Sequence, residues 1–159
     1  MSWIIRRKPE FSDGEIDLFP LRSPLNEREL GFGRERIWRI TEHGERHEIG
    51  QIAYRPGEGR GIFFFGHIGY HIAPPWRGKH FARKACLLIR EEIARSGKSS
   101  VIITCDPDNE PSRKTCLALG CLWERDVDVD KDLQEKYEIS SRKSRFIWIV
   151  QRGNECLQR

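Results

Sequence analysis

The chain has 159 residues, of which 38% are hydrophobic and 10% aromatic, enough for one domain with its own core. Its 28 basic and 24 acidic residues leave a net charge of +4, which suits an anionic cofactor and does not by itself indicate nucleic acid. No apolar run approaches the roughly 18 residues that span a bilayer, and no apolar stretch follows the charged segment 1–7, so neither a membrane span nor a secretion signal is expected.

The cysteine pattern indicates a reducing, cytoplasmic environment. There are five cysteines, an odd number, and none forms a C-x-x-C pair. A zinc site built from Cys116 and Cys121 with His67 or His71 would lack the ligand spacing of zinc motifs, so no metal is expected.

The amino-terminal half predicts antiparallel strands. Residues 15–21 alternate between apolar and polar, and Pro20 suggests that the end of this strand lies at an edge. Residues 23–30 predict a short helix with a serine cap. Residues 36–41 and 47–54 alternate as well, and the glycine between them favours a hairpin.

Residues 60–66, Arg-Gly-Ile-Phe-Phe-Phe-Gly, offer an alternative function. They weakly resemble the RNA-recognition signature, in which aromatic side chains exposed on a strand stack on bases. The match fails at its second glycine, taken by Phe63, and at its final aromatic, taken by His67. Three adjacent phenylalanines are more typical of a core or of the wall of an apolar cleft.

The clearest pattern is a strand, a turn, a helix and a second strand. Ile68, Tyr70 and Ile72 alternate with small or polar residues, as in a strand. After the turn at 74–82, apolar residues recur at helical spacing until Ser96-Gly97. The β-branched run 101–105 predicts a strand covered on both faces. A helix between two such strands makes a right-handed crossover, so the strands should be parallel.

The turn is basic and precedes a helix. Amides at a helix amino terminus lack intrahelical partners and lie at the positive end of the dipole, where phosphate commonly binds. Arg77, Lys79 and Arg83 add formal charge, which suits a multiply charged anion. The alternative is that these side chains are merely solvated.

Residues 77–82, Arg-Gly-Lys-His-Phe-Ala, resemble the pyrophosphate-loop motif Q/R-x-x-G-x-G/A of the GCN5-related N-acetyltransferases (GNAT). The resemblance continues through residues 66–70 before the loop and through 103–109, Ser112 and 119–120 after it. It implies an α/β (α+β) fold: a mixed, mostly antiparallel sheet of about six to seven strands, a parallel pair that forms a coenzyme A cleft, and flanking helices. We expect a single domain over residues 1–159, with its CoA-binding core at about 66–123.

The motif departs from the family at its first glycine, which is His80 here, while Ala82 satisfies its last position. If that glycine serves a positive φ, histidine is a tolerant replacement at a cost of about 1 kcal/mol. If it serves close approach of the backbone to pyrophosphate, the side chain of His80 must point away or weaken cofactor binding.

The resemblance implies acetyl-CoA as co-substrate and direct attack on its thioester by a primary amine of a small molecule or peptide. An alkylamine is unprotonated in only about one molecule in 2,500 at pH 7, so a base or water chain must take its proton. The implied cofactor-binding residues include a main-chain oxyanion donor near Ile72. The full set is Ile72, Arg77, Gly78, Lys79, His80, Phe81, Ala82, Arg83, Asn109 and Ser112.

Two side chains are candidates for proton transfer. His71, with His67 nearby in the sequence, carries an imidazole, the side chain that most often serves as a base near neutral pH. The family's usual acid is a tyrosine seven residues after the asparagine, where this chain has Cys116; a thiol can donate, or the residue belongs to the core. A catalytically silent acyl-CoA-binding domain is therefore the second reading.

The carboxy-terminal third predicts a helix capped by Asn109, an edge strand near 126–130, a polar loop at 131–143 and a final strand at 145–150. That final strand could pair across subunits, so the chain is expected to be a monomer or a homodimer. Residues 154–159 predict a frayed tail. No motif identifies the acceptor.

Overall fold

The computed structural model describes residues 7–23 and 30–151, which form eight strands and four α-helices. The strands are β1 (Phe11–Ser12), β2 (Ile16–Leu21), β3 (Arg36–Glu42), β4 (Glu48–Tyr54), β5 (Ile68–Ile72), β6 (Ser100–Cys105), β7 (Leu122–Asp128) and β8 (Arg142–Ile149). The helices are α1 (Arg60–Phe65), α2 (Phe81–Arg95), α3 (Glu110–Ala118) and α4 (Lys131–Tyr137). None of the described helices is long and apolar enough to cross a membrane.

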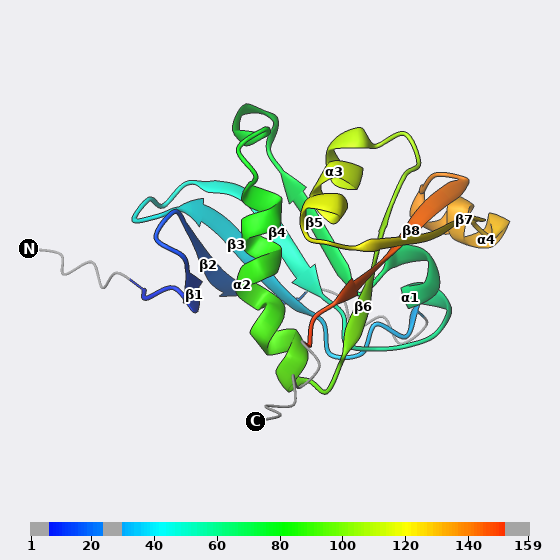
Figure 1. Ribbon diagram of the computed structural model, residues 1–159, viewed down its shortest axis with the longest axis horizontal. Helices are drawn as coiled ribbons and strands as arrows, with labels where there is room; N and C mark the ends of the chain where they lie inside the picture. The colour runs from blue at the N-terminus through cyan, green and yellow to red at the C-terminus, as the bar shows by residue number, and fades with distance from the viewer. Residues whose placement is uncertain (1–6, 24–29, 152–159) are drawn as a thin grey trace, which may run out of the picture.

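All eight strands belong to one sheet in the order β1-β2-β3-β4-β5-β6-β8-β7 (Figure 1). Every neighbouring pair is antiparallel except β5 and β6, which confirms the predicted mixed sheet and its parallel pair. The β5–β6 ladder is reduced to one pair, Ile68 with Ile103, whereas β4–β5 and β6–β8 pair along their lengths. The two parallel strands therefore separate beyond Ile68.

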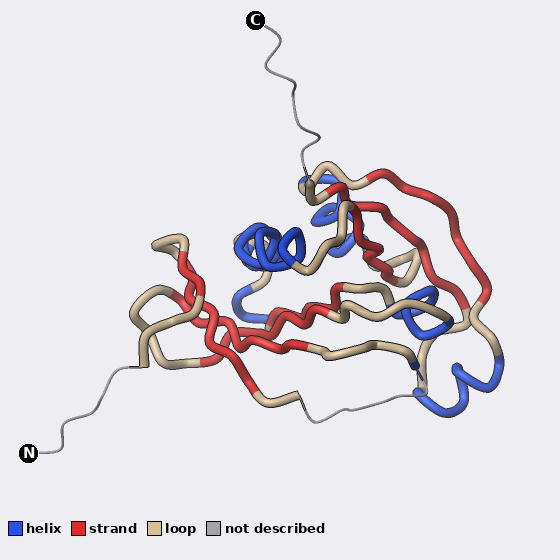
Figure 2. Tube along the Cα trace, turned by 90° about the horizontal axis from the view of Figure 1, so that it is seen from below, coloured by secondary structure: helices blue, strands red, loops and turns tan. Residues whose placement is uncertain are grey.

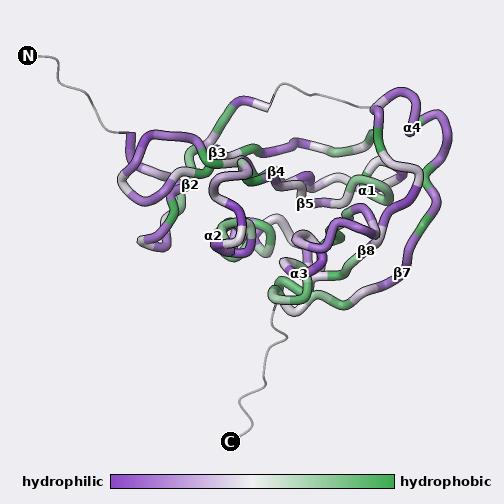
Figure 3. Tube along the Cα trace, turned by 90° about the horizontal axis from the view of Figure 1, so that it is seen from above, coloured by the Kyte–Doolittle hydropathy of each residue, from purple (hydrophilic) through white to green (hydrophobic). Residues whose placement is uncertain are grey.

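Helix α2 covers one face of the sheet and packs against β2, β4, β5 and α3 (Figures 1 and 2). Its apolar residues fall on one side, as their spacing predicts, while hydrophilic residues occupy the other (Figure 3). The buried side chains of α2 are Phe81, Ala82, Ala85, Cys86, Ile89 and Ile93. A second cluster, Leu30, Phe32, Ile62, Phe64, Val129 and Leu133, joins α1 to α4.

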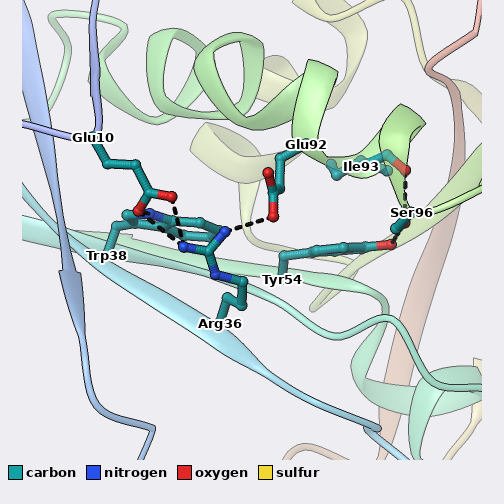
Figure 4. A network of polar contacts seen from close by, with 7 residues as sticks. All are labelled: Glu10, Arg36, Trp38, Tyr54, Glu92, Ile93 and Ser96. Atoms are coloured by element: carbon teal, nitrogen blue, oxygen red, sulfur yellow. Dashed lines mark hydrogen bonds and ion pairs between the residues drawn. The ribbon is translucent and has the colours of Figure 1, made fainter.

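A polar network ties the carboxy-terminal half of α2 to the sheet (Figure 4). Arg36 on β3 donates to the carboxylates of Glu10, at 2.6 Å, and Glu92 on α2, at 2.5 Å. Its guanidinium also lies 4.7 Å from the ring centroid of Trp38, whose indole N–H donates to Glu10 at 2.8 Å. These contacts link Glu10, which precedes β1, to β3 and α2, so the helix is held at a defined position over the strands.

Several sequence predictions change in the structure. The segment with three phenylalanines forms helix α1, so the strand required for RNA stacking is not there. The predicted loop at 131–143 contains α4 and the start of β8, because Leu133 is buried in the second cluster. Strand β8 is internal and β7 is the edge, so β8 has no free edge for pairing across subunits. The predicted helix at 23–30 falls mostly, and the tail at 154–159 entirely, outside the described residues.

Candidate active site

The turn between β5 and α2 has the backbone conformation that a motif glycine would allow. His80 is the N-cap of α2 with φ 63° and ψ 23°, in the left-handed region, and its side chain is exposed. Histidine therefore takes the positive φ directly, and the residue remains exposed. The backbone thus agrees with the first explanation for the motif glycine, which is that this position requires a positive φ.

Substitutions at His80 should report this backbone strain. His80→Gly is expected to raise the free energy of unfolding by up to about 1 kcal/mol, because glycine removes the Cβ strain but gains unfolded-state entropy. His80→Val should lower it by about 1–2 kcal/mol, since a β-branched side chain is poorly suited to this region. Urea titrations of the two variants measure both effects. A clear loss of stability with glycine would contradict the assignment.

The start of α2 presents a row of unpaired amides. Lys84 is the first helical residue to donate to a preceding carbonyl, that of His80 at 3.1 Å. Across the described residues, no acceptor is present for the N–H groups from Gly78 to Arg83. The amides therefore remain available to an anion at the positive end of a 15-residue helix.

These amides border a cavity of about 710 Å³ between the turn and α3. Apart from Lys79, every residue predicted to bind the cofactor lines it. Positive charge comes from Arg83 and Lys114, while Arg77 also donates from Nε to the carbonyl of Ile72 at 2.8 Å and so holds the turn against β5. The lining residues are Tyr70, His71, Ile72, Trp76, Arg77, Gly78, His80, Phe81, Ala82, Arg83, Asn109, Glu110, Pro111, Ser112, Lys114, Thr115 and Ala118.

The separation of β5 from β6 leaves a main-chain donor in this cavity. Ala73 donates its N–H to Ile49 on β4 at 2.8 Å. Because successive residues of a strand direct their N–H groups to opposite sides, the N–H of Ile72 is directed toward β6. The β5–β6 ladder has already ended there, so this N–H faces the gap between the strands.

A smaller cavity of about 250 Å³ adjoins the first and reaches α1 and β8. Tyr70, Asn109 and Ser112 line both cavities and so mark their junction. The smaller cavity is lined by Arg55, Phe64, Phe65, Ile68, Gly69, Tyr70, Thr104, Cys105, Asp106, Asn109, Ser112 and Lys143. It combines an apolar wall with three charged side chains.

Hydrogen bonds fix the groups at the junction. Asn109 accepts from the backbone N–H of Ser112 at 3.2 Å, so it caps α3 as its position predicts. The hydroxyls of Tyr70 and Ser112 are 2.9 Å apart. Burial, followed by the neighbouring Cys116 and Cys86, raises the pKa of Tyr70 above its ordinary value. Its hydroxyl is therefore a neutral donor at the point where the cavities meet.

A family model described as acetyltransferase (GNAT) domain matches residues 3–122. The chain belongs to the GNAT acetyltransferase family. A comparison with curated protein sequences finds no match.

Solved structures share the GNAT fold with this chain at 13–20% identity. One is the ribosomal-protein-S5-alanine acetyltransferase from Vibrio fischeri, with a TM-score of 0.56 and 20% identity over 74% of this chain and 62% of that one. A second is the microcin C7 self-immunity acetyltransferase in complex with acetyl-CoA and AMP, with a TM-score of 0.56 and 20% identity over 78% and 63%. A third, from Chromobacterium violaceum and assigned to the GNAT family, has a TM-score of 0.57 and 13% identity over 94% and 93%. The chain thus spans slightly less than two thirds of the first two.

The three residues considered for proton transfer occupy different environments within this GNAT fold. His71 is exposed and lines the larger cavity, but not the smaller one. Cys116 is fully buried and lines neither cavity, and its hydrogen bond with Cys121, together with burial, raises its thiol pKa. His67 is buried, with Nδ1 accepting the N–H of Ile102 at 2.9 Å, so it fastens β5 to β6.

Two residues that the sequence did not identify stand out in the GNAT cleft. Tyr70 counted only as an alternating strand residue, and Arg55 had no motif around it. Burial lowers the pKa of Arg55, because nearby charge does not fully compensate its guanidinium. No sequence pattern marks Tyr70 or Arg55 as a site residue, because the place of each in the cleft depends on where β5 separates from β6. Within the described part of the chain, no group of three or more His, Cys, Asp or Glu side chains could hold a metal ion.

Proposed function

We propose that this protein is a cytoplasmic, acetyl-CoA-dependent N-acetyltransferase that transfers an acetyl group to a primary amine by direct attack. The observation that carries the proposal is the continuity of the cleft. Unpaired amides at 78–83 open into a cavity that meets, at Tyr70 and Ser112, a second cavity with charged walls. The four described cysteines are free and buried, which suits a reducing compartment.

The cofactor would occupy the larger cavity. Its diphosphate would accept hydrogen bonds from the amides of residues 78–83, with Arg83 and Lys114 adding charge. Its pantetheine arm would pass Asn109, which would place the thioester at the junction of the cavities. The smaller cavity is then left for the amine.

The reaction requires stabilisation of an oxyanion, stabilisation of the departing thiolate and removal of a proton from the amine. The described residues offer a group for each. Attack on the thioester carbonyl develops an oxyanion, which the N–H of Ile72 can stabilise. Tyr70 would donate a hydrogen bond to the departing thiolate, with Ser112 orienting its hydroxyl. His71, exposed at the edge of the larger cavity, would take the proton of the amine through water.

Two measurements test the proposal together. Coenzyme A at 100 times its Kd should stabilise the protein by about 2.7 kcal/mol, and acetyl-CoA with a panel of primary amines should release free thiol. Stabilisation without thiol release from any amine would favour the catalytically silent reading. Absence of both would reject the cofactor site.

A matched pair of variants sharpens the cofactor test. Arg83 lines the larger cavity and Lys79 does not, although both are exposed basic residues near the start of α2. Arg83→Gln is expected to raise the Kd for coenzyme A about tenfold, whereas Lys79→Gln should change it by less than about threefold. Isothermal titration calorimetry at low ionic strength measures both values. Equal effects would point to general charge attraction instead of a defined contact.

A further inference from the structure

We infer that the smaller cavity selects a small amine that also carries a carboxylate, which Arg55 binds. The inference rests on the proposed acetyltransferase function and specifies its acceptor. It depends on the N–H donors that Arg55 leaves unpaired, on the free acceptor of Asp106 in the same cavity, and on the size of the cavity.

Arg55 follows β4 directly and is held from several sides. Its backbone N–H donates to the carbonyl of His67 at 2.7 Å, and its guanidinium lies 4.6 Å from the ring centroid of Phe32. Only 17% of the side chain is exposed, yet it lines the smaller cavity. The cation is therefore positioned mainly by packing, and its ion pair with Glu35 is long, at 3.9 Å.

The guanidinium retains unused donors. Nη1 donates to the carbonyls of Phe65, at 3.2 Å, and Gly66, at 3.3 Å. The carboxylate of Glu35 is 3.9 Å from Nε, beyond hydrogen-bond distance, and Nε is buried without an acceptor. Across residues 7–23 and 30–151, no acceptor is present for Nη2. Since Nε is buried, Nη2 is the donor of this guanidinium that a ligand oxygen can pair with.

Gly69 directs this guanidinium against β5. A Cβ built at position 69 would lie 3.0 Å from Nη2 and 3.3 Å from Nη1 of Arg55. The missing side chain thus allows the cation to lie beside the residue that precedes Tyr70. The open donors therefore lie against β5, in the cavity that meets the larger one at Tyr70 and Ser112.

The other charged pair in the cavity leaves an acceptor free. Lys143 and Ser140 both donate to Oδ1 of Asp106, each at 2.6 Å, so the charge of Lys143 is already paired. Although burial acts to raise it, these bonds hold the pKa of Asp106 below its ordinary value. Oδ2 accepts from none of the described residues and can receive an N–H of the substrate amine.

The cavity thus offers donors at Arg55 and an acceptor at Asp106 within about 250 Å³. This volume is below the roughly 300–1,000 Å³ of pockets for drug-sized ligands. A molecule of amino-acid size, with an amine at one end and a carboxylate at the other, matches both its polarity and its volume.

The test compares acceptors that differ only in the anionic group. We would measure kcat/KM for β-alanine against β-alaninamide and for 4-aminobutanoate against 4-aminobutanamide. The protein should favour each carboxylate about 10- to 100-fold over its amide. In Arg55→Met this ratio should fall to within about threefold of unity, while Arg55→Lys should retain part of it.

Arg39→Met is the matched control. Arg39 also stacks on a phenylalanine, Phe19 at 4.5 Å, but lies outside both cavities. It should keep the full carboxylate preference. Because each ratio is measured within one variant, a reduced folded fraction cancels, and stabilisation by coenzyme A checks that the cofactor site of Arg55→Met is intact.

Calorimetric binding of 4-aminobutanoate to the coenzyme A complex separates this inference from the proposed function. Turnover of carboxylates and amides at equal rates, or an unchanged ratio in Arg55→Met, would overturn the inference and leave the acetyltransferase standing. Arg55-dependent binding without turnover would support the subsite and overturn the proposed reaction. Neither binding nor turnover would overturn both.

Discussion

Tyr70→Phe is expected to lower kcat about 100-fold while the Kd for acetyl-CoA changes by less than about threefold. The hydroxyl of Tyr70 lies where the two cavities meet and is held by Ser112 at 2.9 Å. A preorganised donor aimed at developing charge contributes about 2.7–4 kcal/mol to catalysis. In the proposed complex the hydroxyl would face the departing sulfur and not the nucleotide, so the loss should appear in turnover and not in binding.

Tyr54→Phe is the control for this experiment. Tyr54 is more deeply buried than Tyr70 and lines neither cavity, and its hydroxyl is 2.5 Å from the Oγ of Ser96 (Figure 4). It should lose about 1 kcal/mol of stability and little activity. Cys116→Ser should likewise remain within a few-fold of the parent. A hundredfold loss in Cys116→Ser, with Tyr70→Phe nearly unaffected, would transfer the donor role to the thiol.

The pH profile adds a second check on Tyr70. Its pKa is raised above the ordinary value near 10 mainly by burial, so the hydroxyl keeps its proton throughout the usual assay range. In a plot of kcat against pH, any loss of activity up to about pH 10 should therefore have the same midpoint in the parent and in Tyr70→Phe. A midpoint present in the parent and absent from Tyr70→Phe would contradict the raised pKa.

Trp38→Ala is expected to lower the free energy of unfolding by about 3–5 kcal/mol, and the Tm by about 10 °C. The ring has no exposed surface, its indole N–H donates to Glu10, and the guanidinium of Arg36 lies against it. Loss of the ring leaves a cavity beneath α2. It also removes the hydrogen bond to Glu10 and the cation–π contact with Arg36. Thermal and urea unfolding measure the change.

Trp123→Ala is the matched control, because Trp123 is 54% exposed on the edge strand β7. It should change the stability by less than about 1 kcal/mol. Trp38 lines neither cavity, so Trp38→Ala should bind coenzyme A normally well below its own Tm. Similar destabilisation by both variants would contradict the assignment of Trp38 to the core.

Local patterns in the sequence accounted for the elements around the cofactor cleft. The spacing of Ala82, Ala85, Cys86, Ile89 and Ile93 predicted the buried face of α2, and the position of Asn109 predicted the cap of α3. These predictions succeeded because each feature involves residues within a few turns of one another. They did not succeed for α1 and α4, whose short segments become helical by burying Phe64 and Leu133 in a cluster assembled from distant parts of the chain.

The amino-acid sequence by itself determined the fold class, the basic turn and the helix that together present amides to an anion. Only the tertiary structure decided that Tyr70 meets Ser112, 42 residues later, and that Arg55 lies in a cavity with Asp106. These meetings depend on the single β5–β6 pair, Ile68 with Ile103, after which the strands separate. The point of separation results from packing summed over the whole sheet, and no local run of residues encodes it.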